Sequence, residues 1–151
     1  MYTDGAARGN PGPGGYGVVL LSGSHSKELS KGFLLTTNNR MELMAVIAGL
    51  EALKKENCNV SVFSDSRYVV DAVEKGWVFE WESKRFKNKK NPDLWIRFLQ
   101  LYRKHKVVFK WVKSHADNPL NERCDRMAVE ASKSFDRLPD EGYNDKDYPL
   151  M

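Results

Sequence analysis

Apolar positions along the chain follow two different spacings, and each spacing predicts one kind of element. Short apolar runs bounded by turn residues predict strands. The stretch from Leu43 to Leu53 instead places Leu, Val and Ile three and four residues apart, as on one face of a helix. On this basis strands are predicted at residues 2–3, 18–21, 28–36, 60–64 and 107–112, and helices at 38–53, 66–73, 93–104 and 121–135.

The order of these elements predicts the fold class. Gly and Pro crowd residues 9–17, which predicts a tight connection between strands. The strand at 60–64 follows a helix, so a parallel strand–helix–strand unit is expected. An α/β fold with a mixed sheet flanked by helices is therefore predicted. The 151 residues fit one domain, predicted at 1–135, followed by an acidic, polar and loosely held tail at 136–151.

Composition narrows the choice of partner. No apolar run is long enough to cross a bilayer, and Cys58 and Cys124 make neither a disulfide framework nor a paired-cysteine metal motif. A cytoplasmic protein with reduced thiols and no membrane partner is the simplest interpretation. The net charge is +4, and one basic segment stands out: Lys84, Arg85, Lys87, Lys89 and Lys90. Such a segment predicts contact with nucleic acid, although a solvated surface loop would have the same composition.

Four carboxylates occur near predicted element ends or in a helix: Asp4, Glu42, Asp65 and Asp125. Each alone has an ordinary structural explanation. Asp4-Gly5 has the composition of a turn that would end the first strand. Glu42 lies three residues after Asn39, as in a capping box, and Asp65 precedes a helix, as an N-cap would. Asp125 could be a solvated charge on a helix.

Taken together, the four acids indicate a metal site. Function gathers at the carboxyl ends of parallel strands, and Asp4 and Asp65 are predicted to lie at such ends. Carboxylate oxygens suit Mg²⁺, crowded carboxylates need a cation to offset their repulsion, and paired metals can activate water in phosphodiester cleavage. His115, in a polar loop, is either an idle surface histidine or a proton carrier beside the metals.

Several short motifs occur in a fixed order and spacing. They are Y-T-D-G at 2–5, G-N-P-G-P-G-G-Y-G at 9–17, T-T-N-N-R-M-E-L-M-A at 36–45, S-D-S-x-Y-V at 64–69, D-L-W at 93–95, W-V-K-S-H-A at 111–116 and N-E-R-C-D at 121–125. The set strongly resembles bacterial type 1 ribonuclease H over nearly the whole chain. Before Thr-Asp-Gly, family members usually carry several apolar residues, whereas here only Met1 and Tyr2 stand there.

The resemblance implies the ribonuclease H fold, a five-stranded mixed sheet with helices on its faces. It implies an endonuclease that cuts the RNA strand of RNA–DNA hybrids by a two-metal mechanism, with Mg²⁺ or substituting Mn²⁺, leaving 5′-phosphate and 3′-hydroxyl ends. It assigns metal binding to the four acids, and it assigns proton transfer or product release to His115.

The resemblance also assigns substrate contacts. The positions that match contacts to the RNA strand near its 2′-hydroxyls are Asn10, Asn38 and Asn39. Those near a DNA-strand phosphate are Thr37, Arg40 and Asn91. Those of the family's substrate-binding protrusion are Trp77, Trp81 and the basic segment, with Phe86 where a Trp is common. Asn side chains can form hydrogen bonds with a 2′-hydroxyl, which is both a hydrogen-bond donor and an acceptor. Trp95 is predicted to pack in the core instead.

Two other functions share part of this pattern. A DNA-processing integrase or resolvase also has clustered acids, but it lacks the T-T-N-N-R-M-E stretch at 36–42. A silent hybrid-binding module would not need all four acids. Cleavage of RNA–DNA hybrids explains the four acids and the T-T-N-N-R-M-E stretch together. A monomer with no obligate protein partner is expected.

Overall fold

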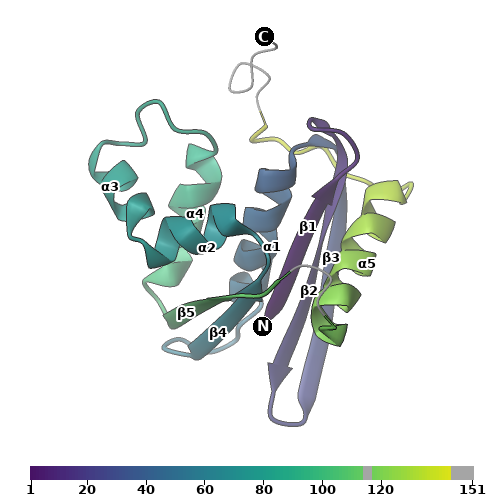
Figure 1. Ribbon diagram of the computed structural model, residues 1–151, viewed down its shortest axis with the longest axis horizontal. Coiled ribbons are helices and arrows are strands. Elements are labelled where there is room, and N and C mark those ends of the chain that lie inside the picture. Colours follow the sequence, from purple (N-terminus) through teal and green to yellow (C-terminus); the bar gives the residue numbers. More distant parts are fainter. Residues whose placement is uncertain (114–116, 144–151) are drawn as a thin grey trace.

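The computed structural model describes residues 1–113 and 117–143, and its strands form one five-stranded sheet (Figure 1). In chain order the elements are β1 (Tyr2–Ala7), β2 (Gly12–Ser22), β3 (His25–Thr36), α1 (Asn38–Glu51), β4 (Asn59–Ser64), α2 (Arg67–Glu74), α3 (Trp77–Ser83), α4 (Pro92–Tyr102), β5 (Lys106–Trp111) and α5 (Pro119–Lys133). The sheet order is β3-β2-β1-β4-β5. Because β1 pairs antiparallel with β2 and parallel with β4, the predicted mixed sheet is confirmed. Among the described residues, no helix has both the length and the apolar composition that crossing a membrane requires.

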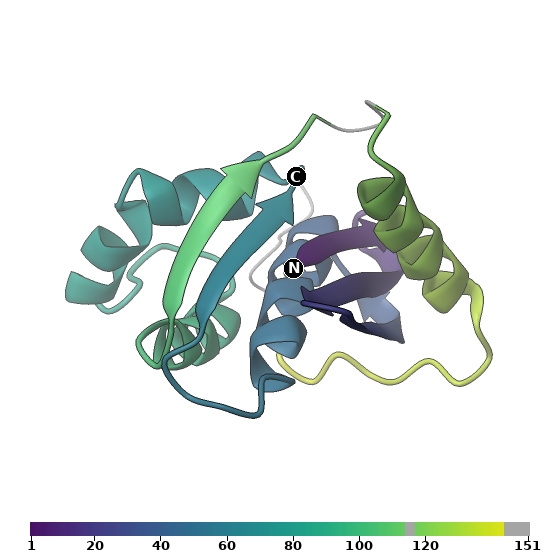
Figure 2. The same cartoon turned by 90° about the horizontal axis from the view of Figure 1, so that it is seen from below.

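Helices cover both faces of the sheet. α5 lies across β1, β2 and β3 on one face, while α1 lies against β1 and β2 on the other and packs against α4 (Figure 2). Trp95 of α4, the largest fully buried side chain among the described residues, contacts the rings of Tyr68, Trp81 and Phe98. The prediction that Trp95 packs in the core is therefore confirmed. These aromatic contacts join α2, α3 and α4 into one layer, and the apolar area they bury stabilises it.

The first strand is longer than its sequence predicts. β1 does not break at Asp4-Gly5 but continues to Ala7. Asp4 pairs with Gly17 and Gly5 with Tyr16, both on β2. These pairs provide hydrogen-bond partners for backbone groups of β1 that would remain unpaired in a turn. The interpretation of Asp4-Gly5 as a turn is therefore wrong, because long-range pairing outweighs the local preference.

The Gly- and Pro-rich stretch 9–17 is also more regular than predicted, since β2 already begins at Gly12. The glycines there serve close packing. A Cβ on Gly15 would lie 2.5 Å from the carbonyl oxygen of Ala128 in α5. Gly therefore occupies this strand because a helix backbone lies directly on it.

α3 is an element that the apolar spacing does not predict. Its sequence, WVFEWES, places four large apolar residues within five positions, so no single face stands out. Of these only Val78 is buried, while Trp77 is 44% exposed. The other strands and helices occur where predicted, with ends shifted by a few residues.

The chain after α5 is held to the body at Leu138 and Asp140. The N–H of Leu138 donates to the carbonyl of Gly32, and the N–H of Leu34 donates to the carbonyl of Leu138, both at 2.9 Å. Asp140 forms an ion pair with Arg40 at 2.7 Å. The prediction of a loosely held tail is therefore wrong at these residues, whereas the domain boundary predicted after residue 135 stays a prediction.

We expect Gly15→Ala to destabilise the protein by about 1–3 kcal/mol, because the added methyl group has to displace the backbone of α5. Urea-induced unfolding measures the change in the free energy of unfolding. Lys27→Ala, at an exposed position of β3, is the control and should change this free energy by less than about 0.5 kcal/mol. Equal effects of both substitutions would show that α5 does not depend on this close approach.

Candidate active site

The pairing of β1 with β4 brings two of the predicted acids together. Tyr2 pairs with Phe63 in parallel register, and their rings stack with centroids 4.6 Å apart. Asp4 and Asp65 each stand two residues after this pair, and their ligand oxygens lie within 4.8 Å of each other. Asp65 follows the end of β4, as predicted, but Asp4 lies inside β1, so the prediction that it ends a strand is wrong. β1 continues past Asp4 because its residues up to Ala7 pair with β2.

The third acid, Glu42, stands directly after the first turn of α1. This turn can lie on β1 because Gly5 has no side chain: a Cβ there would overlap the backbone of Met41 and Glu42. The N–H of Gly5 donates to Oδ1 of Asp4 at 2.9 Å and also to Oε1 of Glu42. One backbone donor thus holds two carboxylates that are each only 5% exposed.

The capping explanations for these acids are wrong. α1 is capped by Thr37 and not by Asn39, and the side chain of Thr37 accepts from the helix backbone. α2 is capped by the side chain of Ser66, not by Asp65. Glu42 and Asp65 therefore do not cap these helices, and both line the cavity that also contains Asp4.

Three of the carboxylates converge at a single point. The ligand oxygens of Asp4, Glu42 and Asp65 all lie within 4.8 Å of one another. Asp125 of α5 lines the same open cavity, which has a volume of about 430 Å³. Divalent Mg²⁺ and Mn²⁺ prefer hard oxygen ligands, so this donor set fits a divalent cation.

Burial makes negative charge costly at this point. Burial raises the pKa of Asp4 to about 7 against the effect of its hydrogen bond with Glu42. The nearby charges of Asp65 and Asp125 also raise this pKa. Burial raises the pKa of Glu42 well above its usual range, and the charge of Asp4 adds to the effect. A cation would offset this repulsion, so protons and metal ions compete for the same carboxylates.

The three asparagines predicted to contact RNA lie on one side of the acids. Asn38 and Asn39 are exposed in the first turn of α1 and line the cavity of the acids. Asn10, in the connection between β1 and β2, accepts from the backbone N–H of Asn38 through Oδ1 at 3.0 Å. The structure therefore brings these distant positions together beside the carboxylates.

Thr37, Arg40 and Asn91, predicted near a DNA-strand phosphate, also lie together, but inside the protein. They are 2%, 1% and 1% exposed. The five N–H groups of Arg40 donate to oxygens of Asp93, Asp140 and Asn91. Burial disfavours its charge, yet the bonds to Asp93 and Asp140 keep the pKa of Arg40 above its usual range. A direct phosphate contact by Arg40 would require one of these bonds to open.

α3 and the loop at residues 84–91 form the protrusion (Figure 1). Trp77 and Trp81 line a groove of about 370 Å³ there, together with Tyr68. Trp81 also packs on the core, with the ammonium of Lys89 5.1 Å from its ring centroid. A flat, apolar groove with lysines at its edge suits stacking on a sugar or base. Tyr68 lines the cavity of the acids as well, so the two sites are adjacent.

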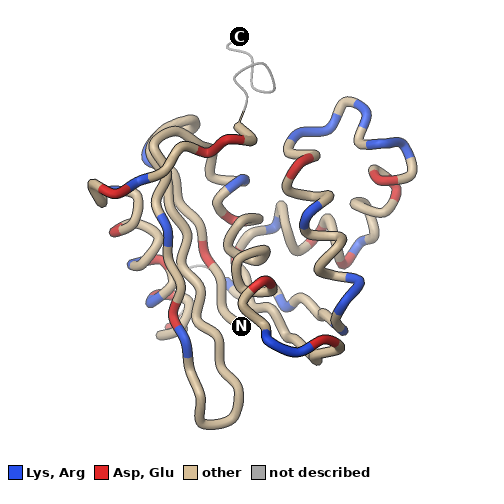
Figure 3. Tube along the Cα trace, turned by 180° about the vertical axis from the view of Figure 1, so that it is seen from behind, with Lys and Arg blue, Asp and Glu red and all other residues tan. Residues whose placement is uncertain are grey.

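The basic segment occupies the outer part of the protrusion, and Figure 3 shows Lys and Arg following one another along its loop. Phe86 is 7% exposed, so the loop is anchored to the core although its charges are at the surface. Lys84 forms an exposed ion pair with Glu80 at 3.1 Å. The basic segment is thus an exposed, positively charged surface on an anchored loop, and its contact with substrate stays a prediction.

His115, the predicted proton carrier, lies outside the described residues. The sequence interpretation also missed two features of the site. Nothing in the pattern indicated that the Gly5 N–H would hold the acids, because that contact depends on the approach of α1. Tyr68 stands inside the S-D-S-x-Y-V motif, and that motif was the available signal for its place between the cavity and the groove.

Comparisons with known proteins agree with this arrangement. The sequence profile of the RNase H family matches residues 1–133. A protein named Ribonuclease H from Desulforamulus reducens is 61% identical over 138 residues, which cover 88% of this chain and 86% of that protein. Ribonuclease HI of Synechocystis sp. is 51% identical over 149 residues, which cover 95% of this chain and 92% of that protein.

Two solved structures have the same fold. LC9-RNase H1, a type 1 RNase H with the type 2 active-site motif, has a TM-score of 0.74 at 31% identity, covering 87% of this chain and 70% of that chain. LC11-RNase H1, solved in complex with RNA/DNA hybrid, has a TM-score of 0.65 at 30% identity, covering 86% of this chain and 93% of that chain.

The fold and the carboxylate site define a nuclease, and the family profile and relatives show that the chain belongs to the RNase H family. Within the family it is a bacterial-type, type 1 ribonuclease H.

We expect the metal-free protein to lose stability as the pH rises from about 4 to about 7. The folded protein keeps the proton of Asp4 up to about pH 7, whereas the unfolded chain releases it near pH 3.8, so rising pH favours unfolding across that range. Asp4→Asn has no such charge. It should exceed the parent in stability by on the order of 2 kcal/mol at about pH 8 and by nearly nothing at about pH 4.

Thermal unfolding in EDTA at the two pH values measures this difference. Added Mg²⁺ should then stabilise the parent more than Asp4→Asn, because the metal binds the folded carboxylates. A difference between parent and variant that is the same at both pH values would contradict the assignment of the raised pKa.

Proposed function

We propose that this protein hydrolyses the RNA strand of RNA–DNA hybrids endonucleolytically, leaving 5′-phosphate and 3′-hydroxyl ends. The convergence of Asp4, Glu42 and Asp65 within 4.8 Å, beside the exposed Asn38 and Asn39, is the observation that carries the proposal. The structurally similar LC11-RNase H1 was solved with an RNA/DNA hybrid, which fits the same substrate class.

Metal binding is proposed for the four acids Asp4, Glu42, Asp65 and Asp125. When bound with substrate, two Mg²⁺ ions, or Mn²⁺ in their place, supply activation of water and stabilisation of the leaving oxygen. The chain's own part is to hold the carboxylates in one place, and the shared Gly5 N–H does this for Asp4 and Glu42. His115 is proposed to carry a proton or to assist product release.

Recognition of the hybrid is divided between its two strands. The amides of Asn10, Asn38 and Asn39 are proposed to bind 2′-hydroxyls of the RNA strand, because this group distinguishes RNA from DNA. The protrusion, with its aromatic groove and basic segment, is proposed to hold the DNA strand, mainly through phosphates.

A cleavage assay in Mg²⁺ with labelled hybrid, double-stranded RNA and double-stranded DNA tests the proposal. We expect internal cuts in the RNA strand of the hybrid alone. Cleavage of the DNA duplex would contradict the proposal, and so would binding of the hybrid without any cleavage. We also propose a cytoplasmic location, because the free thiols of Cys58 and Cys124 suit a reducing compartment. A monomer is proposed because one chain supplies all four acids.

Asp4→Asn and Asp65→Asn should each reduce turnover by at least about 10²-fold, because each removes charge from a preorganised electrostatic site. Hybrid binding should change little, since neither acid belongs to the protrusion or to the asparagines that are proposed to bind the hybrid. Single-turnover cleavage and a binding titration measure the two effects. Glu130→Gln, an exposed acid on α5, is the matched control and should retain parental turnover. Near-parental turnover of either Asp variant would refute its metal-binding role.

Replacing all five residues of the basic segment with Ala should raise KM for the hybrid and leave kcat at saturation nearly unchanged. Phosphate contacts position a duplex without taking part in chemistry. Each lost contact should flatten the slope of log K against log salt by roughly 0.9 for a B-like duplex.

Affinity measured at several salt concentrations checks this expectation. A variant with five other exposed lysines replaced by Ala (Lys27, Lys54, Lys55, Lys104 and Lys106) has the same net charge and is the control. If both variants lost affinity equally, the basic segment would contribute only to overall charge.

A further inference from the structure

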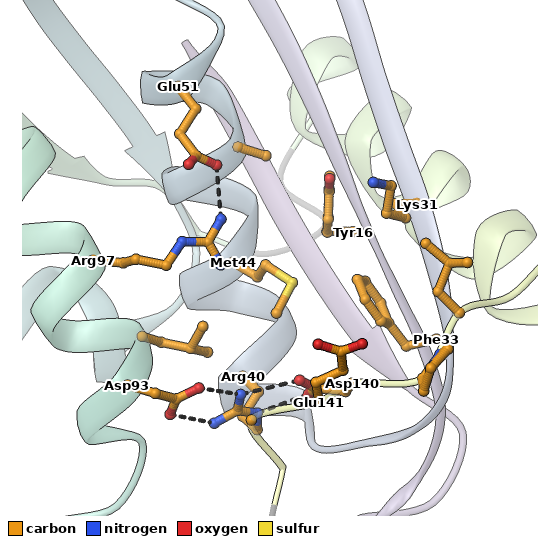
Figure 4. A pocket seen from close by; sticks show the side chains of 15 residues that line it. Tyr16, Lys31, Phe33, Arg40, Met44, Glu51, Asp93, Arg97, Asp140 and Glu141 are labelled. Atoms are coloured by element: carbon orange, nitrogen blue, oxygen red, sulfur yellow. Dashed lines mark hydrogen bonds and ion pairs between the residues drawn. The ribbon is translucent and has the colours of Figure 1, made fainter.

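A buried polar network connects the chain after α5 with the base of the protrusion. Its centre is Arg40, which lies between Asp93 of α4 and Asp140 (Figure 4). Nε of Arg40 donates to Oδ2 of Asp140 at 2.7 Å, and Nη2 donates to Oδ2 of Asp93 at 2.8 Å. The two carboxylates thus fix the guanidinium from opposite sides.

Asp140 is the more enclosed of the two carboxylates. Its side chain is 2% exposed, against 42% for Asp93. It also accepts from the hydroxyl of Thr36 at 2.7 Å. It belongs to the C-terminal strap, residues 136–143, which is anchored to β3 at Leu138. The match to the family profile ends at residue 133, before the strap begins.

On its other side the network reaches the protrusion. Nη1 of Arg40 donates to Oδ1 of Asn91 at 3.2 Å. Asn91 directly follows the basic segment and caps α4 in a left-handed conformation, with φ at 63°. Its Nδ2 donates to the hydroxyl of Tyr68 at 3.0 Å, and this hydroxyl also accepts from Trp95 at 2.9 Å. Tyr68 forms the shared wall of the catalytic cavity and the Trp77–Trp81 groove.

The charge distribution explains why Asp140 matters to this arrangement. A buried guanidinium needs compensation, and without Asp140 its remaining charged partner is the half-exposed Asp93. Arg40 would then follow Asp93 towards solvent, and its bond to Asn91 would weaken. The end of the basic segment and the wall formed by Tyr68 would lose their common support.

We propose that Asp140 is a positioning residue that acts through Arg40 and Asn91 to hold the protrusion in place for the hybrid. The C-terminal strap is thereby part of the substrate grip, although it contacts no substrate itself. This inference rests on the proposed function for its effect on substrate, but not for its effect on the protrusion.

Two substitutions test it. Asp140→Asn removes the charge, and Gly142→Ala displaces the strap without changing a charge, because the added methyl group would overlap Oδ2 of Asp93 and lie 2.6 Å from Nη2 of Arg40. Glu51→Gln is the matched control. It breaks the exposed 2.8 Å ion pair with Arg97, which joins the same two helices, α1 and α4.

The first measurement is amide hydrogen exchange of the full chain without substrate. Both test substitutions should speed exchange at residues 84–91 by at least about tenfold relative to parent and control, with much smaller changes in β1 and β2. Unchanged exchange in the protrusion would overturn the proposal. So would an equal increase throughout the sheet, since it would mean that Asp140 only supports overall stability.

The second measurement is steady-state cleavage of the hybrid. Asp140→Asn should raise KM by about tenfold and change kcat by less than about twofold. In the background of the five-Ala basic segment it should add less than about twofold, because both changes then act on the same grip. Fully additive effects would overturn the proposal. If the parent did not cleave hybrids, the proposed function would fail, while the exchange experiment would still decide whether Asp140 holds the protrusion.

Discussion

The close approach of α1 to β1 at Gly5 is the contact on which the rest of the structure depends. Without a side chain at this position, the first turn of the helix rests directly on the strand. That contact brings the carboxylate of Glu42 to Asp4 and lets one N–H hold both. It also sets the position of Arg40, half a turn earlier on α1, and through it the strap and the base of the protrusion. The position of the carboxylates and that of the base of the protrusion therefore depend on the same contact between α1 and β1.

Two buried charge clusters lie a few residues apart on α1, and they are handled in opposite ways. Around Arg40, one positive charge meets two carboxylates, so the protein compensates it internally. Around Glu42, acids meet acids, and burial raises the pKa of Asp4 to about 7. In the first cluster the opposite charges compensate one another, whereas in the second the like charges repel and would need a cation to compensate them. This division is typical of a site where stability is sacrificed for function.

The protrusion illustrates how a charged surface element can be fixed to the core. Its outer part carries charge, but Phe86 and Trp81 fasten it to the core, and Trp95 packs against Trp81 at a ring-centroid distance of 5.9 Å. At its base, Asn91 and Tyr68 add directional hydrogen bonds to this apolar packing. Apolar contacts resist separation, while hydrogen bonds fix orientation, so the combination limits how far the groove can move relative to the acids.

The sequence by itself determined the elements with strong periodicity, such as α1 with its apolar residues from Leu43 to Leu53, and it indicated the four acids as candidate metal ligands. Both are recorded locally, the first in the spacing of side chains and the second in short motifs whose order carries the family resemblance. A parallel setting for β4 was predictable because that strand follows a helix, whereas its pairing with β1 was decided by the tertiary structure.

Only the tertiary structure decided features that depend on partners distant in the sequence. Asp4-Gly5 has the composition of a turn, yet pairing with β2 keeps it in a strand, and Gly15 lies in a strand because α5 needs the space. The motif placed Arg40 near a phosphate contact. In the structure its side chain is buried, and its N–H groups donate to two carboxylates and an amide. The sequence predicted that Asp140 belongs to a loosely held acidic tail. In the structure Asp140 is fixed by its ion pair with the buried guanidinium of Arg40. Local composition states what a residue can do, and packing decides which of its possible partners is present.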